Sequence, residues 1–416
     1  MVRVNRSPSQ MFAWVLDAPI AQRRTLLAAS LGWMLDSMDV MLYALALPAI
    51  RASLHMSIAT GGLIMSLTLI SAAAGGVMFG SLADRLGRTR MLTATILLYS
   101  TCTALCAVAQ SPLQLGVFRV LLGFGMGGEW AAGAALVAES WPAEKRGKAL
   151  GLVQSAWAIG YAVAALLVAV VVPHLGWRVV FLFGALPGLV ALWVRRKVPE
   201  PVVPGSSGGP DAARGSLTAL FARPLRGRTL LFTTMNAASL FAYWGLFFWV
   251  PQFLATPIRD GGRGLDIVQT ASWTALMQGG TFLGYVLFGV IADLWSRKWT
   301  YIMYLCIAAA IVPIYAGTRS ASVVLWLGPL VGFFGTGYFS GFSVMASENF
   351  PYVVRGIALG LCYNLGRVVS AGAPAAIGRL SGRVGIGAAL SLTAVGFLLA
   401  AVLAMGVRET RGRELA

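Results

Sequence analysis

The feature that most constrains this sequence is a series of apolar runs of about 20 residues, the length that an α-helix needs to cross a bilayer. Little polar sequence separates these runs, so most of the chain has lipid as its solvent. The sequence therefore predicts an all-α membrane protein with twelve transmembrane helices. We expect these spans near residues 25–50, 58–82, 91–110, 113–138, 149–172, 178–194, 229–254, 266–291, 299–317, 322–347, 357–378 and 386–407.

Composition excludes most soluble functions. Charged residues make up 11% of the 416-residue chain, against about 25% in soluble domains, and 58% of the residues are hydrophobic. The four cysteines all lie inside apolar runs, without the paired spacing of a zinc site. No serine-histidine-acid arrangement or nucleotide-binding loop is present, so we expect no enzyme activity, no metal and no cofactor other than protons as a coupling ion.

The net charge of +17 has a topological explanation. If the amino terminus is cytoplasmic, most basic residues fall in the inner segments, which is the positive-inside bias of membrane proteins. We therefore expect a multi-pass protein of the bacterial inner membrane with both termini in the cytoplasm, and no nucleic-acid partner. The basic residues in the outer loops are Arg51, Arg178, Arg259, Arg263, Arg319, Arg379 and Arg383.

The chain divides into two similar halves. A Pro/Gly/Ser-rich segment, residues 198–228, is typical of a flexible cytoplasmic linker between the bundles 1–197 and 229–416. Loop residues repeat at an offset of 209: Gly80 and Asp84 correspond to Gly289 and Asp293, and Glu139 corresponds to Glu348. This repetition predicts two pseudo-symmetric six-helix bundles in the same orientation.

The loop Gly80–Arg90 between the second and third spans resembles the signature of the major facilitator superfamily, and the similarity covers nearly the whole chain. The resemblance implies alternating access and a cytoplasmic latch that joins charged loop residues of the two halves. The alternative is that these charges only anchor and cap helix ends. The latch residues would be Gly80, Asp84, Arg85, Arg88, Glu139, Arg146, Asp293, Arg297, Glu348 and Arg355.

Three further stretches, Leu31–Asp39, Arg119–Trp130 and Glu139–Pro142, resemble the sialate/lactate proton symporters, with aromatic-acid proton symporters as near relatives. The resemblance implies import of a small organic anion with a proton. We expect the protein to be a monomer in the lipid bilayer. Ser37 and Met38 depart from the family's usual Gly-aromatic pair, which places the substrate in question.

Charged residues within the spans are candidate functional groups, because each is expensive in a bilayer without a partner or an aqueous cavity. Asp36 and Asp39 lie three residues apart on one helical face, so both should not ionise together and one is expected to carry a proton. A permanent pairing of one aspartate with an arginine is the alternative.

Arg367 on the eleventh span is the expected substrate residue, because a guanidinium stays charged and matches the geometry of a carboxylate. An internal salt bridge to Asp36 or Asp39 is the alternative. Arg119 on the fourth span is expected to orient the aspartates or gate proton entry. Glu129 is either a proton station or a buried hydrogen-bonding group.

Weaker substrate-binding candidates are polar or aromatic residues at mid-span depth, although most such residues in membrane helices serve packing. They are Tyr43, Gln154, Tyr161, Asn236, Tyr243, Gln278, Tyr363 and Asn364. The sequence as a whole predicts a proton-coupled symporter of a small organic monoanion such as sialate, lactate or an aromatic carboxylate. A drug/proton antiporter and a transport-like membrane sensor are the alternatives.

Overall fold

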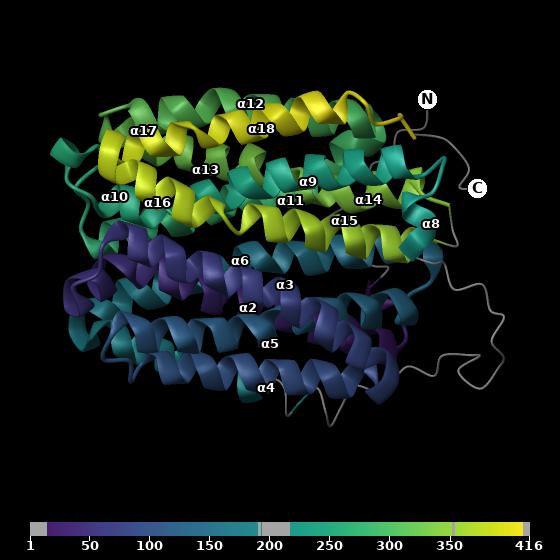
Figure 1. Ribbon diagram of the computed structural model, residues 1–416, viewed down its shortest axis with the longest axis horizontal. Helices are drawn as coiled ribbons and strands as arrows, with labels where there is room; N and C mark the ends of the chain where they lie inside the picture. The colour runs from purple at the N-terminus through teal and green to yellow at the C-terminus, as the bar shows by residue number, and fades with distance from the viewer. Residues whose placement is uncertain (1–14, 190–192, 194–216, 352–353, 411–416) are drawn as a thin grey trace.

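The computed structural model describes residues 15–189, 193, 217–351 and 354–410, and every regular element in these ranges is a helix. The helices run roughly parallel to the long axis of the molecule and form two bundles that lie side by side (Figure 1). The bundle of the first half contains α2 (Ile20–Leu54), α3 (Ile58–Leu86), α4 (Arg88–Cys106), α5 (Pro112–Ser140) and α6 (Ala143–Phe183).

The helix α6 contains two of the predicted spans. Gly176 interrupts it with φ 78° and ψ 170°, a conformation that non-glycine residues rarely adopt. The break lies between the predicted fifth and sixth spans, and the described chain continues beyond it to Leu189.

The second bundle follows α8 (Leu217–Phe221), and four of its spans are pairs of shorter helices. Breaks after Phe247, Gly337, Ser370 and Ser391 divide the seventh, tenth, eleventh and twelfth spans. The elements are α9 (Arg226–Phe247), α10 (Val250–Ala255), η1 (Ile258–Asp260), α11 (Ile267–Leu294), α12 (Arg297–Gly317), α13 (Ala321–Gly337), α14 (Phe339–Asn349), α15 (Arg355–Ser370), α16 (Ala373–Val384), α17 (Ile386–Ser391) and α18 (Thr393–Ala404).

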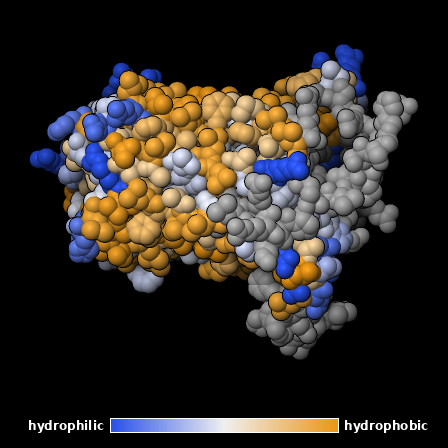
Figure 2. All heavy atoms as spheres, turned by 90° about the horizontal axis from the view of Figure 1, so that it is seen from below, coloured by the Kyte–Doolittle hydropathy of each residue, from blue (hydrophilic) through white to orange (hydrophobic). Residues whose placement is uncertain are grey.

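The surface agrees with a membrane location. Eight segments of the described chain are long and apolar enough to cross a bilayer, and the shorter apolar helix Pro112–Gly127 adds to them. Figure 2 shows a broad apolar face over the middle of the molecule, with hydrophilic residues toward both ends. The fold class predicted from the sequence, twelve membrane-spanning helices in two bundles, is confirmed.

The two bundles pack together mainly through α6 against α11 and α3 against α16. We call the end of the molecule where α10 and α17 lie in Figure 1 the Gly176 end, and the opposite end, where α8 lies, the Glu348 end. Toward the Gly176 end, the Ala375 amide donates to Ser66 Oγ at 3.1 Å, and a Cβ on Gly62 would lie 2.5 Å from the Pro374 carbonyl oxygen. Close helix packing therefore joins the bundles at this end.

Candidate functional site

Four charged side chains are buried among the residues that the structure describes. They are Asp36 and Asp39 on α2, Arg119 on α5 and Arg367 on α15, and none is more than 2% exposed. Two are permanent cations and two are carboxyl groups, so their charges can balance. The candidate site is built around these four residues.

Asp39 is held within the first bundle. Its Oδ2 atom lies 2.9 Å from Thr103 Oγ1 on α4, which donates a hydrogen bond to it. Its Oδ1 atom has no hydrogen-bond partner in the described chain, and a Cβ on Gly184 would come within 3.0 Å of it. Asp39 is therefore enclosed by α4 and by the segment that follows α6.

Arg119 also makes its contacts within the first bundle. Its Nη1 atom donates to the backbone carbonyl oxygen of Asp39 at 3.4 Å, and its guanidinium carbon lies 4.8 Å from the centre of the Tyr43 ring. Nη2 lies 3.9 Å from Met65 Sδ, whereas Nε has no hydrogen-bond partner among the described residues. These contacts place Arg119 as an electrostatic neighbour of the aspartates.

Asp36 differs from Asp39 because neither of its carboxyl oxygens has a hydrogen-bond partner in the described chain. Two cations act on it electrostatically: Arg367 from the second bundle and Arg119 from the first. Asp36 is thus the carboxyl group through which the charges of the two bundles meet.

Arg367 lies about 18 Å along α15 from its first residue, by the usual rise per helical residue. Its guanidinium carbon is 5.6 Å from the centre of the Tyr363 ring, one helical turn earlier. Asn236 on α9 supports this helix, because its Nδ2 donates to the carbonyl oxygens of Cys362 and Tyr363 at 3.3 and 3.4 Å. The predicted substrate residue is therefore fixed by neighbours on α9 and α15.

Aromatic rings continue the site across the interface between the bundles. Trp33, one turn before Asp36, lies 4.7 Å from Trp157 between ring centres. Trp157 Nε1 donates to the Tyr243 hydroxyl of the second bundle at 2.6 Å, and Trp157 also meets the edge of Trp244. An aromatic, largely apolar wall thus begins one helical turn from Asp36.

The remaining predicted substrate residues have other neighbours. Tyr43 donates to the Gly61 carbonyl oxygen at 3.0 Å, and Tyr161 donates to the Phe247 carbonyl oxygen at 2.9 Å. Gln278 is buried with Nε2 unpartnered among the described residues, while Gln154 and Asn364 are half-buried. Asn364 Nδ2 donates to the Gly360 carbonyl oxygen within its own helix.

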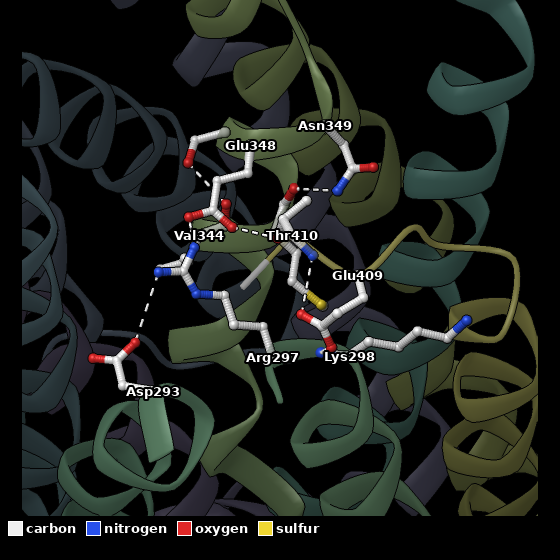
Figure 3. A network of polar contacts seen from close by, with 10 residues as sticks. Asp293, Arg297, Lys298, Val344, Glu348, Asn349, Glu409 and Thr410 are labelled. Carbon is white, nitrogen blue, oxygen red and sulfur yellow. Dashed lines mark hydrogen bonds and ion pairs between the residues drawn. The ribbon is translucent and has the colours of Figure 1, made fainter. Parts of the chain in front are cut away.

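Three of the predicted latch residues, Asp293, Arg297 and Glu348, meet at the Glu348 end of the second bundle, in contacts that lie within that half of the chain (Figure 3). Arg297, the first residue of α12, forms ion pairs with Glu348 of α14 and with Asp293 at 3.7 Å. Glu348 also accepts a hydrogen bond from Thr410, and Glu409 accepts one from Ser296. The segment after α18 is therefore joined to the latch residues of the second bundle.

Several predicted site residues of the first half have side chains that lie outside the described part of the structure. They are Gly80, Asp84, Arg85, Arg88, Glu129, Glu139 and Arg146. Arg355 is half-buried at the start of α15.

Sequence reasoning missed Thr103, the hydroxyl that contacts Asp39. A threonine in an apolar run is ordinary, and nothing in its sequence neighbourhood marks it. Only the packing of α4 against α2 shows its role. Within the described residues, no group of three His, Cys, Asp or Glu side chains is arranged to hold a metal.

Comparisons with known proteins all point to one family of membrane transporters. The model of the Major Facilitator Superfamily matches residues 29–258. A probable 4-methylmuconolactone transporter of Cupriavidus pinatubonensis is 35% identical, over 97% of this chain and 94% of that protein. The sialic acid transporter NanX of Escherichia coli is 28% identical, over 95% of this chain and 96% of its own length.

A solved structure supports the same fold. The crystal structure of a bacterial homologue of the human lysosomal transporter Spinster, in an inward-facing and occupied conformation, matches with a TM-score of 0.71. The match covers 93% of this chain and 97% of that chain, at 17% sequence identity.

Proposed function

Because this chain belongs to the major facilitator superfamily, a family of transporters, we propose that it imports a small organic monoanion together with protons across a bacterial inner membrane. The substrate class includes sialate, lactate and aromatic carboxylates. Related transporters are named for sialic acid and for a muconolactone, which supports an organic-acid substrate. Both termini would lie in the cytoplasm, and the Glu348 end of the described chain would face it.

The observation that carries this proposal is the burial of Arg367. Its side chain is 2% exposed, and it forms no ion pair with a described carboxylate. A guanidinium does not lose its proton under physiological conditions, and an isolated buried charge is strongly unfavourable. A substrate carboxylate would supply the direct ion-pair partner that Arg367 lacks among the described residues, and could accept two parallel hydrogen bonds.

The position of Arg367 favours transport over simple binding. The charges of Asp36 in the first bundle and Arg367 in the second interact across the interface between the bundles. A ligand at this interface would contact both bundles, so their rocking would expose it to each side in turn. The close packing at the Gly176 end supports a state that is closed to the outside.

The two aspartates support the proton as the coupling ion. When a substrate carboxylate binds Arg367, the positive charge is no longer available to Asp36 and Asp39, and protonation of one aspartate would relieve their repulsion. A protein loaded with both anion and proton would carry no additional buried charge as it reorients. A protein loaded with only the anion or only the proton would carry one additional buried charge.

The test is binding and counterflow with purified protein. Thermal stabilisation would be measured with sialic acid, lactate, nicotinate, benzoate and gentisate, and the acids that stabilise the protein would then be followed as radiolabelled substrates in proteoliposomes. We expect at least one acid to exchange across the membrane, and not in the Arg367→Ala variant. Accumulation of tetraphenylphosphonium or ethidium with no exchange of any acid would instead indicate a drug antiporter.

A further inference from the structure

The seventh span breaks where it passes the first bundle. Phe247 is the last residue of α9, and its carbonyl oxygen would ordinarily accept a hydrogen bond from the amide four residues on. That residue is Pro251, near the start of α10, and proline has no N–H. The Phe247 carbonyl therefore lacks its helical donor, although the residue is only 1% exposed.

A side chain of the other bundle supplies a donor in its place. The hydroxyl of Tyr161, on α6, donates to the Phe247 carbonyl oxygen at 2.9 Å, and both residues are buried. A buried carbonyl oxygen that loses its donor is destabilised, whereas one that faces water is not. This hydrogen bond therefore favours the arrangement in which the two bundles meet at Phe247.

The next two residues of the break also lie against the first bundle. The Phe248 ring stacks on Tyr43 of α2, with 5.9 Å between ring centres. The Trp249 indole N–H donates to the Pro374 carbonyl oxygen at 3.1 Å, and the indole ring lies so close to Gly62 of α3 that a Cβ there would come within 2.9 Å of it. Three consecutive residues of span seven thus contact α6, α2 and α3.

These contacts lie between the buried charges and the Gly176 end. Tyr161 is one turn beyond Trp157 on α6, and Tyr43 is one turn beyond Asp39 on α2, in each case toward that end. Figure 1 shows α10, which follows the break, near the same end of the molecule. The break in span seven is therefore on the side of the site that the proposed topology assigns to the outside.

Building on the alternating access of the proposed function, we propose that Tyr161 is a gating residue, whose hydrogen bond to the carbonyl that Pro251 leaves without a donor holds the bundles together on the outer side of the site. When this side opens, the Phe247 carbonyl oxygen and the Tyr161 hydroxyl separate, and the water that enters hydrates both. In the closed state the hydroxyl is engaged by the backbone and is not available to the substrate.

The proposal can be tested without knowing the substrate. Spin labels at Ala52→Cys and Ala321→Cys, in a Cys306→Ser background, report the distance between the bundles at the Gly176 end by pulsed electron paramagnetic resonance. Both labelled sites are exposed, and the other three cysteines are buried. In lipid nanodiscs without substrate, the ratio of long to short distances measures how often this end opens.

Tyr161→Phe removes only the hydroxyl. It should raise the ratio by roughly fivefold, because a hydrogen bond that exists only in the closed state is lost. Tyr338→Phe is the matched control, since the Tyr338 hydroxyl donates to the Ser239 carbonyl oxygen at 3.0 Å and is equally buried, but both residues belong to the second bundle. This control should leave the ratio unchanged.

Pro251→Ala tests the origin of the acceptor. Alanine provides an N–H four residues after Phe247, so the carbonyl has a donor within its own span whether or not the bundles meet. Pro251→Ala should itself raise the ratio of long to short distances. In this background Tyr161→Phe should change the ratio by less than about twofold, because the two substitutions act on the same hydrogen bond.

Three results would overturn the assignment: a ratio that Tyr161→Phe leaves unchanged, an equal rise in Tyr338→Phe, or an equal effect of Tyr161→Phe with proline and with alanine at position 251. None of these distances depends on an anion or a proton. Failure here would therefore leave the proposed anion import standing, and failure of the counterflow assay would leave the gating role of Tyr161 standing.

Discussion

Arg367 shows how one residue constrains the function of a membrane protein. Its charge is permanent, its side chain is buried, and the chain maintains it there with a tyrosine one turn away and an asparagine that fixes the helix. Lysine would not be equivalent, because a point charge lacks the planar fork that binds a carboxylate through two hydrogen bonds.

The first prediction concerns this arginine. Arg367→Ala should abolish stabilisation by organic acids while the protein remains folded, since it removes a buried charge and leaves the helix intact. Arg367→Lys should weaken binding by roughly tenfold or more, because one of two charge-assisted hydrogen bonds is lost. Thermal-shift titration of nicotinate, benzoate and sialic acid is the measurement.

The matched control is Arg383→Ala, which removes an exposed arginine from α16, the next helix along the chain. Its binding curves should overlay those of the unmodified protein. Equal loss of binding in both variants would show that Arg367 has no specific part in anion recognition.

The second prediction tests the two aspartates by transport. Asp36→Asn and Asp39→Asn should each exchange labelled acid across the membrane at near the normal rate, and at least one of them should fail to concentrate it above equilibrium, because no proton is taken up. Counterflow and gradient-driven uptake, measured on the same vesicles, distinguish exchange from accumulation, and concentration of acid by both variants would refute the coupling role.

At this scale the sequence singled out most clearly the residues that violate the apolar pattern. Asp36, Asp39, Arg119 and Arg367 are conspicuous because a charge in a membrane span needs an explanation. Thr103 is not, since threonine is common in such helices. Its role depends on the rotation of α4 relative to α2, which local pattern does not determine.

At the scale of the helices, the breaks in the second bundle are the main addition to what the sequence predicted. Each predicted span is present, but the seventh, tenth, eleventh and twelfth are divided. A hydropathy pattern reports the length of an apolar run and cannot locate a change of direction within it. The break at Ser370 comes three residues after Arg367, so it ends the helix segment that carries the proposed substrate residue.

Close packing of helices through glycine gives the third prediction. Gly279 and Gly280 are neighbours on α11, yet a Cβ on Gly280 would lie 1.9 Å from the Pro329 carbonyl oxygen of α13, while one on Gly279 would meet nothing within 4 Å. Gly280→Ala should therefore destabilise the protein by about 1–3 kcal/mol through overpacking.

Gly279→Ala is the matched control and should leave stability unchanged or raise it by up to about 1 kcal/mol, since alanine is the better helix former. Thermal unfolding in detergent compares the two variants. A larger loss of stability in Gly279→Ala than in Gly280→Ala would mean that α11 and α13 do not pack as described.

The latch of the second bundle gives the fourth prediction. Arg297→Ala removes the partner that Glu348 and Asp293 share, and leaves Glu348, whose side chain is 10% exposed, without its cation. The free energy of unfolding should fall by roughly 1–3 kcal/mol, because a largely buried group is left without its partner. Arg226→Ala, an exposed arginine at the same end, should change the melting temperature little, and equal shifts in both variants would contradict the network.

At the scale of the whole molecule, the sequence predicted the class and the count of spans because both follow from local hydropathy and from the repeat of loop residues. It did not predict which helices join the bundles. The contact of Ser66 with Ala375 links residues 309 positions apart and depends on side-chain shapes along α3 and α16. The neighbours of the four buried charges were unpredictable for the same reason.

The arrangement of charges across the whole molecule supports one central proposal: an organic monoanion enters together with protons. The most direct test measures both fluxes in the same proteoliposomes, with a radiolabelled acid from the panel and a pH-sensitive dye inside. With an inward gradient of one pH unit, we expect protons to enter with the anion and the acid to accumulate, by about tenfold for one proton per anion, and an uncoupler to abolish both effects. Anion entry that is indifferent to the proton gradient would contradict the account.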